Sequence, residues 1–261
     1  MVITAGIDVG STATKAVIFD GTIRSIVIIP TGWNPKEAGR NVFLESLNQA
    51  GLQEQDVDRI VGTGYGRVSL SFIDKKVTEI TCHAKGAKFL FPQTRTVIDI
   101  GGQDSKVIAV AEDGSVADFI MNDKCAAGTG RFLQVMTGIL DITLAELGQM
   151  ASGSEPVSIN SMCTVFAESE IIGLLAQEVT KETIASGIVH TIAKKLISLT
   201  SRVPCLAEIT FSGGVANNPE ICTILSSILG VRFNIPQQPQ VVGALGAALV
   251  GFGNLKEGKD G

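Results

Sequence analysis

The chain has 261 residues, 45% of them hydrophobic, and this composition can bury a large core in one big domain or in two of ordinary size. Its formal net charge is -5, and Lys and Arg are scattered, which argues against a basic surface for nucleic acid or anionic lipid. The longest mostly apolar run, residues 241–252, is too short and too rich in glycine to span a membrane. Since the N-terminus also lacks the basic segment of a signal peptide, we expect a cytoplasmic protein with no membrane or nucleic-acid partner.

The first motif is a hairpin whose turn carries groups suited to phosphate. An apolar strand over residues 3–9 leads through the sequence DVGSTATK into a second strand over residues 15–19. Gly10 permits a tight turn, Ser11 and Thr12 offer hydroxyl and N–H groups to phosphate, and Asp8 can hold magnesium directly or through water. The motif is weak when it stands alone, because D-x-G-[ST] also occurs in ordinary hairpins.

Regular elements follow this hairpin. Apolar patterning predicts a strand over residues 23–29, a helix over 36–50, a strand over 58–63 and a helix that begins near residue 79. Trp33, in the loop before the first of these helices, is interpreted as a packing residue. No role follows from the residues themselves for Arg67 or for the neighbours Cys82 and His83, whose adjacency on a helix favours a structural role over metal binding.

The chain then repeats the chemistry of the first hairpin. A β-branched strand over residues 96–100 runs through DIGGQDSK into a strand over residues 106–110. Both copies combine an apolar strand, an aspartate, a glycine turn and a second strand. Two such hairpins predict two similar lobes with a cleft between them.

A lone cysteine next precedes a glycine-rich turn. Cys125 stands before the turn at residues 128–130, and helical spacing of apolar residues predicts a helix over 131–140. The N–H groups of this turn are therefore expected to be unpaired and available either to nucleotide phosphate or to an anionic sulfur centre held by Cys125. Cys163 repeats the arrangement before another apolar helix, and the alternative for each cysteine is a small buried hydrophobe.

The last third of the chain alternates helices and strands. A long helix is predicted over residues 183–203 and a strand over 207–211, which ends in Ser-Gly-Gly at 212–214. Consecutive glycines after a strand allow adenine or ribose to approach closely. A strand over 231–235 and a small-residue helix over 242–249 complete the chain.

The order of DVGSTATK, DIGGQDSK, GTGR, SGGVA and GALGAAL resembles the ATPase superfamily of actin, hexokinase and the large heat-shock chaperones. Within it, NDKCAAGTGRF and SMCTVFAESE are similar to the ATP-dependent activators of 2-hydroxyacyl-CoA dehydratases, which are related to the ATPase subunits of benzoyl-CoA reductase. TGYGR and ITCHAKGA also resemble that pattern. The resemblance covers nearly the whole chain.

The resemblance implies an α/β fold of two ribonuclease-H-like lobes with ATP in the cleft between them. Lobe I would span residues 1–95, with the helix at 243–256 packing back on it, and lobe II would span residues 96–242. Asp8 and Asp99 would organise magnesium and the attacking water, assisted by Gln103 or Asp104. The expected ATP-binding residues are Gly10, Ser11, Thr12, Lys15, Gly101, Gly102, Gly128, Thr129, Gly130, Gly213, Gly214 and Val215.

The same resemblance implies one [4Fe-4S] cluster per homodimer. Such a cluster needs four thiolates, and only Cys125 and Cys163 lie in matching segments, so two subunits would contribute two cysteines each across a two-fold axis. The remaining cysteines are expected to be buried thiols: Cys82, Cys205 and Cys222. ATP hydrolysis would then drive an electron, supplied by a ferredoxin or flavodoxin, to a partner such as a 2-hydroxyacyl-CoA dehydratase. The alternatives are a sugar or acyl kinase of the same fold and a nucleotide-dependent scaffold.

Overall fold

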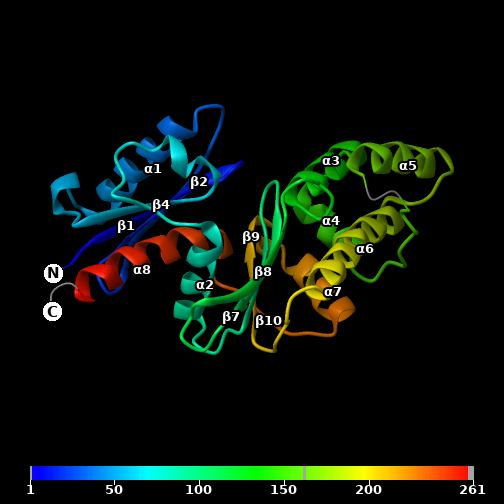
Figure 1. Cartoon of the computed structure of the whole chain (residues 1–261). Coiled ribbons are helices and arrows are strands. Elements are labelled where there is room, and N and C mark those ends of the chain that lie inside the picture. The colour runs from blue at the N-terminus through cyan, green and yellow to red at the C-terminus, as the bar shows by residue number, and fades with distance from the viewer. Residues whose placement is uncertain (1, 161–162, 258–261) are drawn as a thin grey trace. The chain divides into compact units, whose positions relative to one another are not determined.

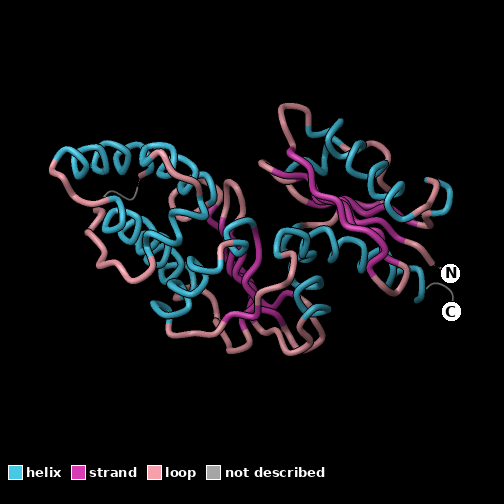
Figure 2. The backbone as a smooth tube through the Cα atoms, turned by 180° about the vertical axis from the view of Figure 1, so that it is seen from behind, coloured by secondary structure: helices cyan, strands magenta, loops and turns pink. Residues whose placement is uncertain are grey.

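The computed structural model describes residues 2–160 and 163–257, and the chain divides into two compact units. Unit 1 contains the described residues of Met1–Thr94, Val110–Ala117 and Pro236–Gly261, and unit 2 contains Arg95–Ala109 and Asp118–Ile235. Each unit has its own five-stranded sheet covered by helices (Figures 1 and 2). The predicted α/β class is therefore confirmed.

The sheet of unit 1 has the strand order β3-β2-β1-β4-β5. Its central strand β1 pairs antiparallel with β2 and parallel with β4. The strands are β1 Thr4–Val9, β2 Ala13–Phe19, β3 Ile23–Pro30, β4 Arg59–Thr63 and β5 Lys75–Lys76, and the α-helices are α1 Pro35–Ala50, α2 Glu79–Leu90 and α8 Val242–Glu257.

Helices α1 and α8 cover opposite faces of this sheet (Figure 1). Alternate residues of β1, including Ile7 and Val9, pack with Phe43 of α1, because successive side chains of a strand point to opposite faces. On the other face a Cβ at Gly6 would lie 1.9 Å from the carbonyl oxygen of Ala244 in α8, so only glycine lets this helix approach so closely.

The sheet of unit 2 has the strand order β10-β9-β6-β7-β8. Strand β6 is central, with an antiparallel neighbour in β7 and a parallel neighbour in β9. The strands are β6 Thr96–Ile100, β7 Ser105–Val110, β8 Val116–Asn122, β9 Ile209–Gly213 and β10 Phe233–Asn234, and the helices are α3 Gly130–Leu140, α4 Leu144–Ala151, α5 Thr164–Ala176, α6 Lys181–Thr200 and α7 Pro219–Leu229.

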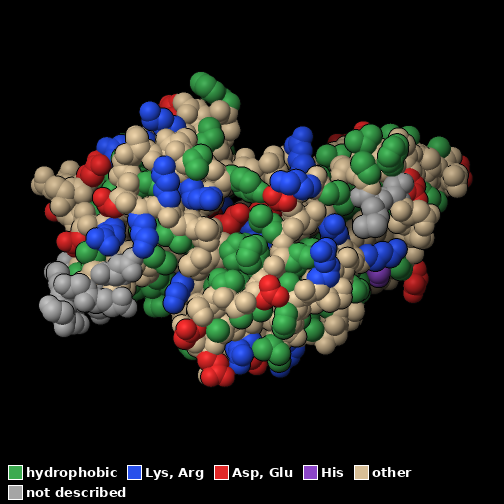
Figure 3. All heavy atoms as spheres, in the orientation of Figure 1, with side chains coloured by type: hydrophobic (Ala, Val, Ile, Leu, Met, Phe, Trp, Pro, Cys, Tyr) green, Lys and Arg blue, Asp and Glu red, His purple; other side chains and the backbone are tan. Residues whose placement is uncertain are grey.

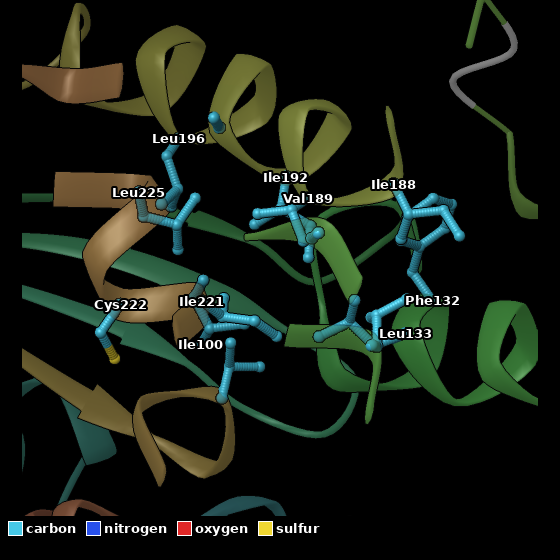
Figure 4. Packing of buried hydrophobic residues seen from close by; sticks show 14 of the residues in the cluster. Ile100, Phe132, Leu133, Ile188, Val189, Ile192, Leu196, Ile221, Cys222 and Leu225 are labelled. Atoms are coloured by element: carbon cyan, nitrogen blue, oxygen red, sulfur yellow. The ribbon is translucent and has the colours of Figure 1, made fainter. Parts of the chain in front are cut away.

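One apolar core joins the helices of unit 2 to its sheet. Figure 4 shows side chains of α3, α6 and α7 gathered with Ile100 of β6, among them Phe132, Ile192 and Ile221. Each of these four side chains is 0% exposed. This packing fixes the end of β6, where the aspartate of the second hairpin lies.

Two side chains lie in surroundings that differ from the prediction. Trp33, interpreted as a packing residue, is 91% exposed, because the loop between β3 and α1 holds it away from both elements. Cys205, expected to be buried, is exposed in the segment between α6 and β9. Within the described part of the chain, no helix combines the length and apolarity needed to cross a membrane.

Candidate functional site

The first hairpin holds its aspartate beside a lysine from the paired strand. Asp8 of β1 lies opposite Lys15 of β2 in the strand register, and Lys15 Nζ is 3.0 Å from Asp8 Oδ2. The Gly10 N–H closes the turn on the carbonyl oxygen of Ala13 at 3.1 Å, and a Cβ at Gly10 would lie 2.9 Å from that same oxygen. Ser11 and the residue after it, at the tip, are exposed, so their hydroxyls are accessible to a ligand.

The second hairpin reproduces this geometry in unit 2. Asp99 of β6 lies opposite Lys106 of β7, and the Gly101 N–H bonds the carbonyl oxygen of Asp104 at 2.9 Å. The two turns have the same length and the same closing hydrogen bond. The internal repeat predicted from the sequence is therefore present in the backbone as well as in the residue types.

The second hairpin has more buried charge than the first. Lys106 Nζ lies 2.8 Å from Asp99 Oδ2 and 2.9 Å from Asp104 Oδ2, and the lysine side chain is only 2% exposed. The Ser212 hydroxyl donates to the other oxygen of Asp99 at 2.8 Å. The contact with Asp104 is an ion pair without hydrogen-bond geometry, since its Oδ2 has no hydrogen-bond partner. One buried cation therefore faces two carboxylates.

Groups from three further segments surround Asp8. Gly64, which follows β4 with φ 79°, is so close that a Cβ there would lie 2.4 Å from Asp8 Oδ1. A Cβ at Gly243 of α8 would lie 3.1 Å from His83 Nε2 and 3.3 Å from Asp8 Oδ2. A side chain at Gly243 would therefore crowd the place where His83 and Asp8 converge. This position of His83, which is 6% exposed, was not predicted, because nothing in its local sequence indicates which strand end α2 packs against.

Cys82 lies near the same group of charges. The pKa of its thiol is raised to about 12, chiefly by burial and to a smaller extent by the carboxylates of Asp8 and Glu79. Arg67 acts in the opposite direction on this thiol and donates from Nη1 to the Gly64 carbonyl oxygen at 2.7 Å. Arg67 thus holds the turn beside Asp8. Glu79 is an acidic group near Cys82 that the sequence prediction missed.

The turn before α3 is closed by hydrogen bonds rather than open to an anion. The Thr129 N–H bonds the Ala126 carbonyl oxygen at 3.1 Å, the Gly130 N–H bonds Gly101 at 2.9 Å, and the Arg131 N–H bonds Gly102 at 2.7 Å. The expectation that this turn offers unpaired N–H groups is therefore wrong for Thr129 and Gly130. Gly101 and Gly102 belong to the turn of the second hairpin, so the start of α3 is joined directly to that turn.

Cys125 lies in a loop that polar side chains hold in place. The Asn122 amide donates to the carbonyl oxygens of Cys125 at 2.8 Å and Ala127 at 3.2 Å. The Thr129 hydroxyl closes the next turn by donating to Ala126 at 2.6 Å. The thiol of Cys125 is free and partly exposed. Its position is thus set by side chains on both sides of it.

Cys163 occupies the N-cap position of α5, and its free thiol is exposed. Helix α5 packs against α3, so the two helices that follow Cys125 and Cys163 are neighbours within unit 2. The preceding residues of the matching segment, Ser161 and Met162, lie outside the described residues. The thiol of Cys163 is therefore accessible at the start of α5.

The other three cysteines have thiol pKa values above the ordinary value. Burial raises the pKa of Cys222 to about 11, and Cys222 and Cys82 are both buried as expected. Cys205 is exposed, but partial desolvation of its thiol still raises its pKa. A raised pKa lowers the thiolate fraction that a metal requires.

The Ser-Gly-Gly segment closes the end of β9 against β6. Gly213 has φ 91°, and a Cβ there would lie 2.2 Å from the Ile100 carbonyl oxygen. Val215, in the 3₁₀ turn Gly214–Asn217, is only 2% exposed and belongs to the apolar core. The side chain of Val215 is therefore part of the core of unit 2.

No group of three or more His, Cys, Asp or Glu side chains suited to a metal ion occurs among residues 2–160 and 163–257. Basic and acidic side chains lie interspersed on the face drawn in Figure 3. The described part of a single chain thus offers two candidate cysteine ligands but not four.

Comparison with known proteins assigns the family. The model of the BadF/BadG/BcrA/BcrD ATPase family matches residues 5–251. The chain belongs to this ATPase family. It is 45% identical over 255 residues to the (R)-2-hydroxyglutaryl-CoA dehydratase activating ATPase of Acidaminococcus fermentans, covering 95% of this chain and 96% of that protein.

Solved structures support the fold of this ATPase family member. The activator of the 2-hydroxyisocaproyl-CoA dehydratase from Clostridium difficile, solved with bound ADPNP, superposes with a TM-score of 0.92 at 42% identity over 99% of this chain and 97% of that one. A ROK hexokinase from Thermus thermophilus has a TM-score of 0.53 at 17% identity, covering 95% of this chain and 97% of that one, which indicates a shared fold only. Both the resemblance to the activators and the actin/hexokinase type of fold are confirmed.

Proposed function

We propose that this protein is an ATP-hydrolysing iron-sulfur reductase that transfers a low-potential electron to a partner enzyme such as a 2-hydroxyacyl-CoA dehydratase. The observation that carries the proposal is the 45% identity, over nearly the whole chain, to an activating ATPase of such a dehydratase. The ADPNP bound to the 42% identical structure supports ATP as the nucleotide. A sugar or acyl kinase of the same fold is not favoured, since the hexokinase is only 17% identical.

ATP binding is assigned to the two hairpins and the Ser-Gly-Gly segment. The exposed tip of the first hairpin, with Lys15 behind it, supplies donors for phosphate, and Asp8 supplies the carboxylate for a magnesium ion. Gly101 and Gly102 allow close approach in the second hairpin, and the backbone of residues 213–215 borders the nucleoside. Asp99 cannot move freely, because Lys106 and Ser212 hold its two oxygens.

The residues at 128–130 are assigned a different role from phosphate binding. The N–H groups of Thr129, Gly130 and Arg131 are bonded to carbonyls, and those of Gly130 and Arg131 bond carbonyls of the second hairpin. A shift of that hairpin on phosphate cleavage would therefore move the first turn of α3 and the loop that carries Cys125. In this proposal the turn transmits the nucleotide state to the cysteine segment.

The cluster ligands are assigned to Cys125 and Cys163 of two subunits. Both thiols are free and neither is buried, whereas the other three cysteines have raised pKa values. Four cysteine ligands require two copies of this pair, which supports a homodimer. A [4Fe-4S] cluster bound there would supply a one-electron redox centre. The electron donor would be a ferredoxin or flavodoxin.

The proposal is tested by activation of a 2-hydroxyacyl-CoA dehydratase in the absence of oxygen. The protein, the dehydratase, ATP and a strong reductant are mixed, and dehydration of the 2-hydroxyacyl-CoA is measured. We expect ATP-dependent activation by the native protein and by Cys205→Ser, and none by Cys125→Ser or Cys163→Ser. Full activation by both ligand-site variants, or phosphorylation of a small molecule without any activation, would contradict the proposal.

A further inference from the structure

The two turns differ at the residues that the repeat places in equivalent positions. Counted from Asp8 and Asp99, Thr12 corresponds to Gln103 and Ala13 to Asp104, since both hairpins have the same strand register and the same closing hydrogen bond. The second turn thus has two polar side chains, an amide and a carboxylate, that the first turn lacks. Their surroundings differ sharply.

Asp104 is held by other groups of the protein. It is 6% exposed, and its Oδ2 lies 2.9 Å from Lys106 Nζ. Its other oxygen packs against the turn itself, since a Cβ at Gly101 would lie 2.4 Å from Asp104 Oδ1. Its main-chain carbonyl accepts the hydrogen bond that closes the turn. Side chain and backbone of Asp104 therefore both fix the shape of the loop.

Asp99 is held in the same network. Lys106 contacts its Oδ2 at 2.8 Å and Ser212 donates to its Oδ1 at 2.8 Å. A carboxylate with a buried ammonium on one oxygen and a hydroxyl on the other is held in a fixed orientation. Neither aspartate of this hairpin is free to reorient toward a water molecule.

Gln103 has the opposite setting, because it is exposed at the tip of the turn. A glutamine amide can accept a hydrogen bond from water through its oxygen and donate one to a phosphate oxygen through its nitrogen. An ionised carboxylate only accepts. Orientation of water beside a γ-phosphate by glutamine is an established solution in nucleotide hydrolysis.

We propose that Gln103 is the catalytic residue that orients the attacking water, whereas Asp104 is a positioning residue that, with Lys106, holds the turn carrying Gln103. The inference rests on the proposed ATPase function. The water oxygen forms a bond to the γ-phosphorus, and the bond from that phosphorus to the β,γ-bridging oxygen breaks. The bonding pair leaves with ADP, and of the two protons of the water one stays on the phosphate product and the other passes to solvent. Asp104 acts on this step only through the position of Gln103.

Single-turnover cleavage of ATP separates these roles, because product release does not limit it. The variants are Gln103→Ala, Asp104→Ala and the double variant, with Gln93→Ala as the control for loss of an exposed glutamine. Asp104→Ala gives the second turn the alanine that the first turn has at the equivalent position. If the alanine variant does not fold, Asp104→Asn is measured in its place. The Kd for ADP reports whether the nucleotide site survives.

We expect Gln103→Ala to slow cleavage about 100-fold with an unchanged Kd for ADP, and Asp104→Ala about tenfold. The double variant should be no slower than Gln103→Ala, because a positioning residue has no effect once the residue it positions is gone. The Gln93→Ala control should cleave at the native rate.

Two outcomes overturn the assignment while leaving the proposed function intact: cleavage by Gln103→Ala within threefold of the native rate, or effects of the two single changes that multiply in the double variant. Multiplication would mean that Asp104 contacts the water independently. Native protein that cleaves no ATP would instead remove the proposed function and this assignment together.

Discussion

Replacing Lys106 with methionine should destabilise unit 2 strongly. The substitution removes the ammonium that faces two carboxylates at 2.8 and 2.9 Å in a site where the lysine side chain is 2% exposed. Removing one partner of a buried ion pair costs about 3–5 kcal/mol of unfolding free energy, since an uncompensated charge remains. Two carboxylates remain here, so we expect a loss toward the upper end of that range.

The measurement is urea unfolding at pH 7 followed by far-UV circular dichroism, with the midpoint and the m-value reported for each variant. Lys106→Met combined with Asp99→Asn and Asp104→Asn removes all three charges while nearly preserving shape. This triple variant should recover at least half of the unfolding free energy lost in Lys106→Met. Removing one partner of a buried ion pair destabilises a protein more than removing all of its charges. Lys15→Met is the matched comparison: that lysine is 14% exposed and faces one carboxylate, so its loss should be smaller.

A loss below about 1 kcal/mol for Lys106→Met would refute this reasoning, since that is the range of an exposed ion pair. A triple variant less stable than Lys106→Met would also refute it. In that case the three charges together would stabilise the fold by their net attraction, and the loss in Lys106→Met would not come from unpaired carboxylates.

Thr143→Ala should lower unfolding free energy by about 1 kcal/mol in thermal denaturation, because Thr143 and Glu146 form a reciprocal capping box at the start of α4; an unchanged midpoint would contradict this. With thiol pKa values raised to about 12 and 11, Cys82 and Cys222 stay protonated at pH 8, so peptide mapping should find them unlabelled by iodoacetamide in the native state and labelled in urea. Rapid native labelling would show that burial does not protect them. Of the two helices that follow the proposed ligands, α3 bonds carbonyls of the second hairpin at its start, whereas the described residues of α5 do not. The two α5 N-termini of a dimer, at ~2 kcal/mol each, therefore limit the potential difference between ADP and ATP-analogue states to roughly 170 mV. A redox titration with equal potentials, or with a much larger difference, would contradict that electrostatic origin.

Local patterns in the sequence predicted the two hairpins well, since each combines an apolar strand with a glycine turn whose closing bond is local. They missed β8 Val116–Asn122, an edge strand with three exposed residues and no clean alternation. They also missed α4, although Thr143 and Glu146 form a readable capping signal. Short elements of this kind depend on neighbours that the local sequence does not show.

Long-range contacts account for what the sequence could not predict in the candidate site. The N–H groups of residues 130 and 131 are bonded to the carbonyls of Gly101 and Gly102, about thirty positions earlier. The local sequence of the turn does not show these partners, so it predicted unpaired N–H groups. The convergence of His83 on Asp8 depends on the packing of α2 against α8. The resemblance to the activators implied Gln103 or Asp104, and their difference in burial distinguishes them in the structure.

The central claim is tested most directly by the content of iron and acid-labile sulfide per chain after purification without oxygen, measured beside the molecular mass in solution. The account predicts a dimer with about two irons per chain, which Cys125→Ala and Cys163→Ala each lose and Cys205→Ala retains. Native protein that contains no iron yet hydrolyses ATP would contradict it, and would leave Cys125 and Cys163 as ordinary thiols of an ATPase.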